Sequence, residues 1–122
     1  FSLFMVLDCQ DKFHHPYQII TLGDSNGAGK AGWVHQLKKI MPVDAIHNMS
    51  ISGNTIGFDN LENPNLNNLD VYLEKGSKNN GYLVFAIILL GTNDSKVIFK
   101  DREKEVLRNM ELLIDQIRNF DY

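Results

Sequence analysis

The chain has 122 residues, of which 43% are hydrophobic, 10% aromatic and 22% charged, a composition typical of one globular domain. Twelve Lys and Arg residues against fifteen Asp and Glu residues give a net charge of −3. This balance lacks the basic excess that nucleic-acid binding requires, and no apolar run approaches the roughly 18 residues of a membrane-spanning helix. We therefore expect neither a nucleic-acid partner nor a membrane span.

Residues 1–16 precede the first predicted strand and are interpreted as an N-terminal arm or a processing remnant. The apolar stretch Phe1–Leu7 runs up to Cys9, so one interpretation is the tail of a secretory signal with Cys9 as a lipid-attachment site. Asp8 opposes this interpretation, because a small residue is expected before such a cysteine. The alternative is a short apolar arm. The compartment stays open between an extracytoplasmic location (secreted or lipoprotein) and the cytoplasm.

The first predicted strand is Gln18–Leu22, a β-branched and apolar segment that ends in a glycine-rich turn at residues 23–27. An amphipathic helix follows and ends at Pro42, because apolar residues recur at helical spacing; they are Trp33, Leu37, Ile40 and Met41. The segment Ala45–Ile51 predicts a second strand, which runs into another turn at residues 52–55.

The Asn-rich segment Gly57–Asn68 is interpreted as a long surface loop, and the leucines around it predict a short helix that ends at Gly76. Tyr82–Leu90 is apolar throughout, which is typical of a central parallel strand covered on both faces. A clean helical stripe predicts a last helix over about residues 102–118. Residues 120–122 are interpreted as the beginning of a fourth strand.

The elements alternate between strand and helix, and this order predicts a doubly wound parallel α/β sheet, a flavodoxin-like three-layer α/β/α fold. In such sheets ligands bind beyond the carboxyl ends of the strands. Three polar, glycine-bearing turns follow the three predicted strands, at residues 23–27, 52–55 and 91–94. The sequence therefore predicts a site at that edge of the sheet.

The first turn offers a nucleophile. A serine at a tight strand-to-helix turn presents its hydroxyl clear of the backbone, and Ser25 lies among Gly23, Gly27 and Gly29, which permit close approach and unusual dihedral angles. The N–H groups of the following helix favour a developing negative charge nearby. The alternative is an ordinary turn in which Ser25 is a helix N-cap.

The other two turns offer hydrogen-bond donors. Acyl transfer needs donors aimed at the carbonyl oxygen, and the backbone N–H of Gly53 and the side-chain amide of Asn93 are of the right kind. The alternative for Asn93 is a plain turn former.

Three segments resemble the first three conserved blocks of the SGNH, or GDSL-type, hydrolase family, over about Tyr17–Asn119. They are Gly23-Asp24-Ser25-Asn26, Gly53 within Ile51–Thr55, and Gly91-Thr92-Asn93-Asp94. The resemblance implies that residues 17–122 are the N-terminal part of a serine esterase domain that hydrolyses a carboxylic ester with a small acyl group, such as an acetyl on a carbohydrate.

The resemblance also implies a role for each matching residue. Ser25 would be the nucleophile, and its N–H, the N–H of Gly53 and the amide of Asn93 would form the oxyanion hole. Asp24 would support the turn. The expected partner is a small-molecule ester, and no cofactor is implied.

The family's fourth block, Asp-x-x-His, has no match after the third, since no histidine follows His47. On this ground the domain is expected to be incomplete at its C-terminal side, with an uncovered sheet edge open to self-association. His14 ends an Asp-x-x-His, but it precedes the first strand and is expected ~16 Å or more from Ser25. His35 is expected on an exposed helix face, and His47 within the second strand.

Two other functions stay open. One is a non-catalytic fragment or binding module that lacks the general base, because an unassisted serine is a poor nucleophile. The other is a nucleotide-binding loop, but the spacing between Gly23 and Gly29 is one residue too long and Ala31 replaces the required hydroxyl. No metal site is predicted, because a single cysteine and scattered aspartates do not form a ligand cluster.

Overall fold

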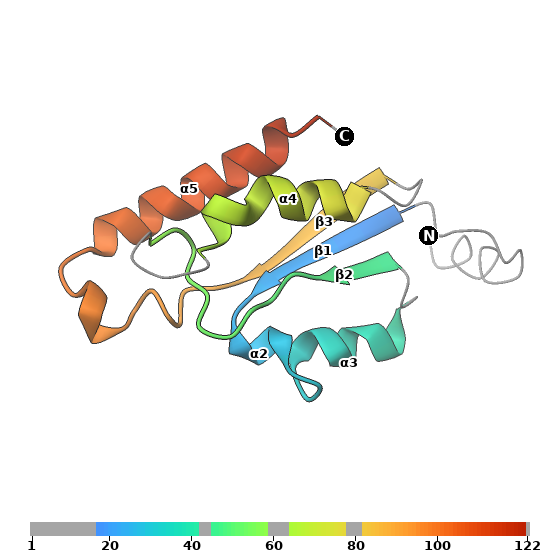
Figure 1. Cartoon of the computed structure of the whole chain (residues 1–122), viewed down its shortest axis with the longest axis horizontal. Coiled ribbons are helices and arrows are strands. Elements are labelled where there is room, and N and C mark those ends of the chain that lie inside the picture. Colours follow the sequence, from blue (N-terminus) through green and yellow to red (C-terminus); the bar gives the residue numbers. More distant parts are fainter. Residues whose placement is uncertain (1–16, 42–44, 59–63, 78–81, 122) are drawn as a thin grey trace, which may run out of the picture.

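The computed structural model describes residues 17–41, 45–58, 64–77 and 82–121, which form a three-stranded parallel sheet flanked by helices (Figure 1). The strands are β1 (Tyr17–Gly23), β2 (Ile46–Asn48) and β3 (Tyr82–Leu89), in the order β2-β1-β3. Both neighbours run parallel to β1. The predicted parallel α/β fold is therefore confirmed. The arm at residues 1–16, with Cys9 and His14, lies outside the described residues.

β1 is the central strand because both of its faces are apolar. Ile20 and Leu22 point into the core beneath α4 and α5, while Ile19 packs on the opposite face with Val34 of α3. All four side chains are buried, and full burial of such a side chain stabilises the fold by roughly 1.5–3 kcal/mol.

The helices lie on both faces of this sheet (Figure 1). One face carries the short α2 (Ser25–Ala28) and α3 (Trp33–Ile40), and the other carries α4 (Asn65–Ser77) and α5 (Glu103–Asn119). A 3₁₀ turn, η2 (Val97–Phe99), precedes α5. The apolar stripes that predicted α3 and α5 pack on the sheet, but Ile40 of the predicted α3 stripe is 80% exposed and does not. Among the described residues, none of the helices has the length and apolar character to cross a bilayer.

The second strand is shorter than predicted, three residues instead of the whole of Ala45–Ile51. The chain nevertheless stays beside β1 as it leaves the sheet, because the N–H of Met49 donates to Thr21 O at 2.9 Å and that of Ile51 to Gly23 O at 3.2 Å. These two bonds carry the second turn to the end of β1.

The helix α4 begins at Asn65, so the expectation of a loop through Asn68 was wrong for residues 65–68. Asn65 is buried, and both its backbone N–H and its side-chain amide donate to Thr55 O, at 3.0 and 2.9 Å. The Asn-rich composition suggested a solvated loop because this long-range anchoring leaves no periodic signal in the sequence. Residues 59–63 of the predicted loop lie outside the described residues.

β3 is an edge strand of the described sheet, not the central strand covered on both faces that its apolar run predicted. Ala86, Ile88 and Leu90 pack toward α4 and α5. On the opposite face Phe85 is 57% and Leu89 54% exposed, because α3 lies over β1 and β2. The predicted fourth strand is also absent from the described residues, since 120 and 121 are not in a strand and Tyr122 lies outside them.

Candidate functional site

The three turns leave the sheet at one edge. Gly23 ends β1, pairs with Leu89 at the end of β3, and accepts the N–H of Ile51 at 3.2 Å from the segment that follows β2. Within a few residues of these contacts come Ser25, Gly53 and Asn93. The turns that carry the three predicted site residues therefore lie at the carboxyl edge of the sheet, where the strands end (Figure 1).

Asp24 caps the turn that carries Ser25. Its side chain, 2% exposed, accepts the N–H of Asn26 at 2.8 Å, and its carbonyl accepts those of Gly27 and Ala28 at 3.1 Å. Ser25 is thus the first residue of α2 rather than its N-cap, and it is exposed. Its hydroxyl makes no hydrogen bond with another described residue, so the side chain is free to meet a ligand.

The glycines around Ser25 serve close approach rather than unusual dihedral angles. Neither Gly23 nor Gly27 has a positive φ. A Cβ at Gly23 would lie 2.7 Å from Ser50 Oγ, and one at Gly27 would lie 2.5 Å from the same atom and 2.9 Å from Trp33 Nε1. Gly29 has an ordinary φ of −80° and no atom within 4 Å of a Cβ position, so neither its conformation nor its packing within the chain requires a glycine. The helix that begins at Ser25, α2, is only one turn long and ends before α3 begins.

Asn48, at the end of β2, joins the sheet to α2. Its amide donates to Gly27 O at 2.9 Å, and its side-chain oxygen accepts from the hydroxyl of Thr21 and from the N–H of Ser50, both at 3.0 Å. This side chain fixes the turn of helix behind Ser25 against β1 and the start of the second turn. Sequence reasoning missed it, because one Asn at a strand end carries no signal of such a role.

Gly53 lies at the tip of the second turn with φ +81°, a left-handed backbone conformation that residues with a side chain rarely adopt. No atom lies within 4 Å of the position a Cβ would take. The backbone there is therefore open to the approach of a ligand, and the conformation explains why a glycine is required.

Asn93 and Asp94 tie the third turn to the second. The Asn93 amide, 7% exposed, donates to Asn54 O at 2.9 Å, and the Asp94 carboxylate, 3% exposed, accepts the N–H of Ile56 at 2.9 Å. Asn93 therefore does more than form its own turn, because its side chain reaches the loop of Gly53. One of the two N–H bonds of this amide remains available for a ligand.

Asp94 is a buried acidic residue at this edge of the sheet. Burial raises the pKa of its carboxyl group, the N–H of Ile56 opposes that rise, and the nearby Asp24 adds to it. Its second oxygen is buried without a partner among the described residues. Asp94 also lines a cavity of about 470 Å³ beside the third turn, together with Gly91 and Phe99.

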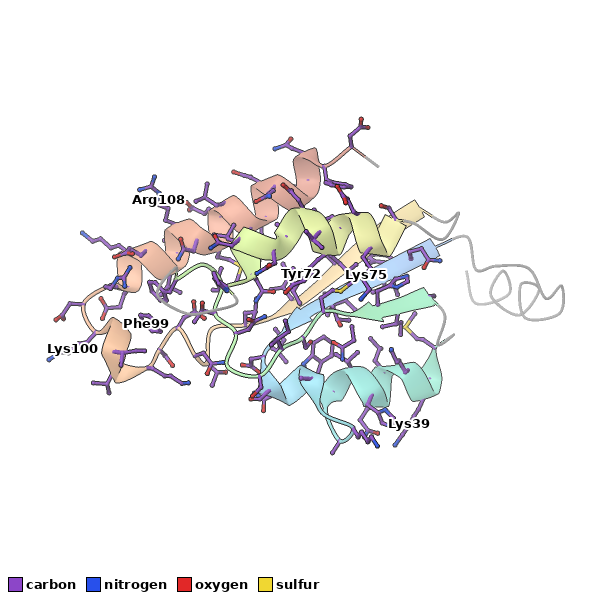
Figure 2. All side chains as sticks on the ribbon, viewed as in Figure 1. Lys39, Tyr72, Lys75, Phe99, Lys100 and Arg108 are labelled. Carbon is purple, nitrogen blue, oxygen red and sulfur yellow. The ribbon has the colours of Figure 1, made fainter. Side chains whose placement is uncertain are left out.

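Phe99, one of the residues that line this cavity, belongs to an aromatic stack. Phe99 of η2 stacks on Phe58 with ring centroids 4.0 Å apart, and the Arg102 guanidinium lies 4.5 Å from the Phe58 centroid. Figure 2 shows Phe99 and Lys100 at the end of the molecule where α5 starts. Neither Phe58 nor Phe99 was a predicted site residue, because their contact joins segments far apart in the sequence.

The described histidines do not bond to Ser25. His35 is exposed on α3. His47 Nε2 lies 2.5 Å from Gln18 Oε1, and His47 pairs with Ile20, so it sits about 10 Å along the sheet from Gly23. Burial lowers the pKa of His47, with further contributions from Lys38 and Lys75. Among the described residues, no group of His, Cys, Asp and Glu is arranged to hold a metal ion.

Comparisons with known proteins give one structural likeness. No protein-family model and no curated protein matches the chain. The crystal structure of a carbohydrate acetylesterase family member from Sinorhizobium meliloti is similar, with a TM-score of 0.68 and 20% identity over 86% of this chain. The chain spans 55% of that protein's length. This likeness shows that the chain shares the α/β fold of part of that protein, the fold class that the order of strands and helices predicted.

Proposed function

We propose that this chain carries the nucleophile and oxyanion hole of an SGNH-type serine esterase that hydrolyses a carboxylic ester with a small acyl group. The observation that carries the proposal is the arrangement of one edge. An exposed Ser25 whose hydroxyl is not used as a cap follows the end of β1, at the same edge of the sheet as the loops of Gly53 and Asn93, which are bonded to each other. The structural likeness to a carbohydrate acetylesterase supports an acetyl group on a sugar as the substrate.

In the proposed reaction, the hydroxyl oxygen of Ser25 attacks the ester carbonyl carbon. The carbonyl oxygen becomes an oxyanion that accepts hydrogen bonds from the N–H groups of Ser25 and Gly53 and from the free N–H of the Asn93 amide. Collapse of this intermediate breaks the bond to the alcohol, which leaves with a proton, and water then hydrolyses the acyl-enzyme. Loss of one oxyanion donor costs about 10²–10³ in kcat in comparable sites.

The general base is assigned to a segment outside the described residues. Neither His35 nor His47 bonds to Ser25, and a serine hydroxyl needs a base to take its proton. The base would hold that proton and return it to the leaving alcohol. The chain spans only 55% of the similar acetylesterase, which leaves room in a protein of that length for such a residue.

Chemical rescue tests the proposal on the chain itself. Hydrolysis of p-nitrophenyl acetate is followed with and without 2-methylimidazole, a hindered base that can take the place of a missing imidazole. We expect a rate that rises with 2-methylimidazole and is lost in Ser25→Ala. Ser77→Ala is the matched control, because Ser77 bonds to Leu73 O and Glu74 O at the end of α4, away from the site. Equal rescued rates for the wild type and Ser25→Ala would rule out Ser25 as the nucleophile.

A binding module without catalysis is the second candidate, favoured by the positions of His35 and His47. It predicts that an acetylated sugar shifts the amide resonances of Gly53 and Asn93 without turnover under any condition. The nucleotide-binding alternative predicts a rise in melting temperature with ATP, and we expect no such rise.

A further inference from the structure

Two consecutive residues join the second and third turns through buried hydrogen bonds. Asn93 holds Asn54 O and Asp94 holds the N–H of Ile56, each at 2.9 Å, across 39 and 38 residues of sequence. The segment 54–56 between these contacts is almost fully buried. The tip of the second turn, Gly53, comes immediately before this segment, so its position follows from how the segment is held.

The same segment is held independently from its other side. Asn65 donates its backbone N–H and its amide to Thr55 O, and the N–H of Leu66 donates to Ile56 O at 2.9 Å. These bonds come from the start of α4 and involve no residue of the third turn. Loss of the Asp94 contact therefore leaves the segment attached to the fold, with the Asn93 amide as its remaining hydrogen-bond partner in the third turn among the described residues.

Burying a carboxylate to accept a single backbone N–H is unfavourable, because the charged group loses its hydration. Asp94 is 3% exposed, and its second oxygen has no partner among the described residues, so much of its desolvation is not repaid by hydrogen bonds. A charged acceptor does, however, make a shorter and stronger bond to an N–H than a neutral one. The desolvation of Asp94 therefore has a structural purpose if the position of the Ile56 N–H has to be held tightly.

We propose that Asp94 is a positioning residue for the oxyanion hole. Its carboxylate holds the 54–56 segment against the third turn, and this fixes the plane of the Asn93 amide and the place of Gly53 relative to each other. One N–H of the Asn93 amide donates to Asn54 O. Because the amide group is planar, this bond also fixes the direction in which its second N–H points. Asp94 itself touches neither the nucleophile nor the substrate in this account, which rests on the proposed function for its catalytic consequence.

The test compares Asp94→Ala with Asp94→Asn, whose side-chain oxygen still accepts the N–H of Ile56. Asp115→Asn on the exposed side of α5 is the matched control. Amide hydrogen exchange at Ile56 and the side-chain NH₂ resonances of Asn93 are measured by NMR. We expect Asp94→Ala to lose protection at Ile56 and to merge or broaden the two Asn93 NH₂ signals. Asp94→Asn and Asp115→Asn should keep both.

The kinetic readout is the Ser25-dependent rate supported by 2-methylimidazole. We expect Asp94→Ala to lower kcat by about 10–100-fold with little change in KM, because a misplaced donor loses part of the effect of an oxyanion-hole deletion. Asp94→Asn should restore most of that rate. A merely structural role would instead lower the melting temperature of Asp94→Ala and leave the Asn93 resonances and kcat unchanged, and that result would overturn the proposal.

The two proposals fail differently. A wild-type protein without any Ser25-dependent rate would refute the esterase function. In that case the NMR measurements still decide whether Asp94 orients Asn93, because they need no turnover. Unchanged exchange at Ile56 and unchanged Asn93 signals in Asp94→Ala would refute the positioning role whatever the rate.

Discussion

Gly27 is the residue whose substitution tests most sharply how the nucleophile turn is packed. It lies in α2, two residues after Ser25, and it is buried. A Cβ at this position would meet Ser50 Oγ at 2.5 Å, Trp33 Nε1 at 2.9 Å and Ser50 Cβ at 3.0 Å. Ser50 follows β2 and Trp33 begins α3, so the two side chains come from different segments. Both would have to move to admit a methyl group.

The expected loss of stability follows from two opposing effects. Overpacking of a well-packed site costs about 1–3 kcal/mol. Alanine regains up to about 1 kcal/mol over glycine through helix propensity, and less than that in a helix of a single turn. We therefore expect Gly27→Ala to lower the free energy of unfolding by about 1–2 kcal/mol. For a domain of this size that is a fall in melting temperature of about 3–10 °C.

Thermal unfolding followed by circular dichroism measures this effect. Gly29→Ala is the control, because Gly29 has φ −80° and nothing within 4 Å of its Cβ position, so its stability should stay equal or rise slightly. Ser50→Ala in the Gly27→Ala background should recover part of the loss by removing the closest atom. If Gly27→Ala is as stable as Gly29→Ala, the close packing behind Ser25 is wrong.

Three further predictions concern other parts of the fold. Asn48→Ala removes the donor to Gly27 O and the acceptor for Thr21, and we expect a loss of about 1–2 kcal/mol in denaturant unfolding; an unchanged midpoint would show that these bonds do not hold α2. The lowered pKa of His47 means that the folded state takes up its proton less readily than the unfolded state. Stability should therefore fall as the pH drops below about 6.5, and His47→Gln, but not His35→Gln, should flatten this dependence. Phe85→Lys places a charge on the open face of β3 and should reduce self-association in sedimentation velocity, whereas Val71→Lys, at a 63% exposed position on α4, should not; equal effects of the two would contradict a role for the β3 face.

The elements that the sequence predicted well are those with a local signal. The β-branched run of β1 and the apolar stripe of α5 are each contained in one segment, and each packs as its periodicity indicates. The three turns were also visible, because Gly, Asp and Asn mark the ends of strands through their own backbone preferences. The order of strands and helices then placed these turns at one edge.

The features that the sequence did not predict depend on contacts between distant segments. Asn65 begins α4 because it bonds to Thr55, and no pattern within residues 57–68 indicates that this bond forms. An apolar run such as β3 looks the same whether one face or both are covered, so only the strand order shows that Phe85 is exposed. The bond between Asp94 and Ile56 spans 38 residues and is likewise invisible in either segment alone.

If Ser25 reacts with an acyl group at this edge of the sheet, the acyl-enzyme forms on Ser25 and is detectable by mass. The chain is incubated with p-nitrophenyl acetate and 2-methylimidazole, and the acetylated residue is located by peptide mass spectrometry. Because 2-methylimidazole also supports hydrolysis of the acyl-enzyme, the reaction is stopped with acid during turnover, which retains the adduct formed by then. We predict an acetyl group on Ser25 in the wild type and in Ser77→Ala. An unmodified Ser25, with acetyl groups confined to lysines as in Ser25→Ala, would contradict the account.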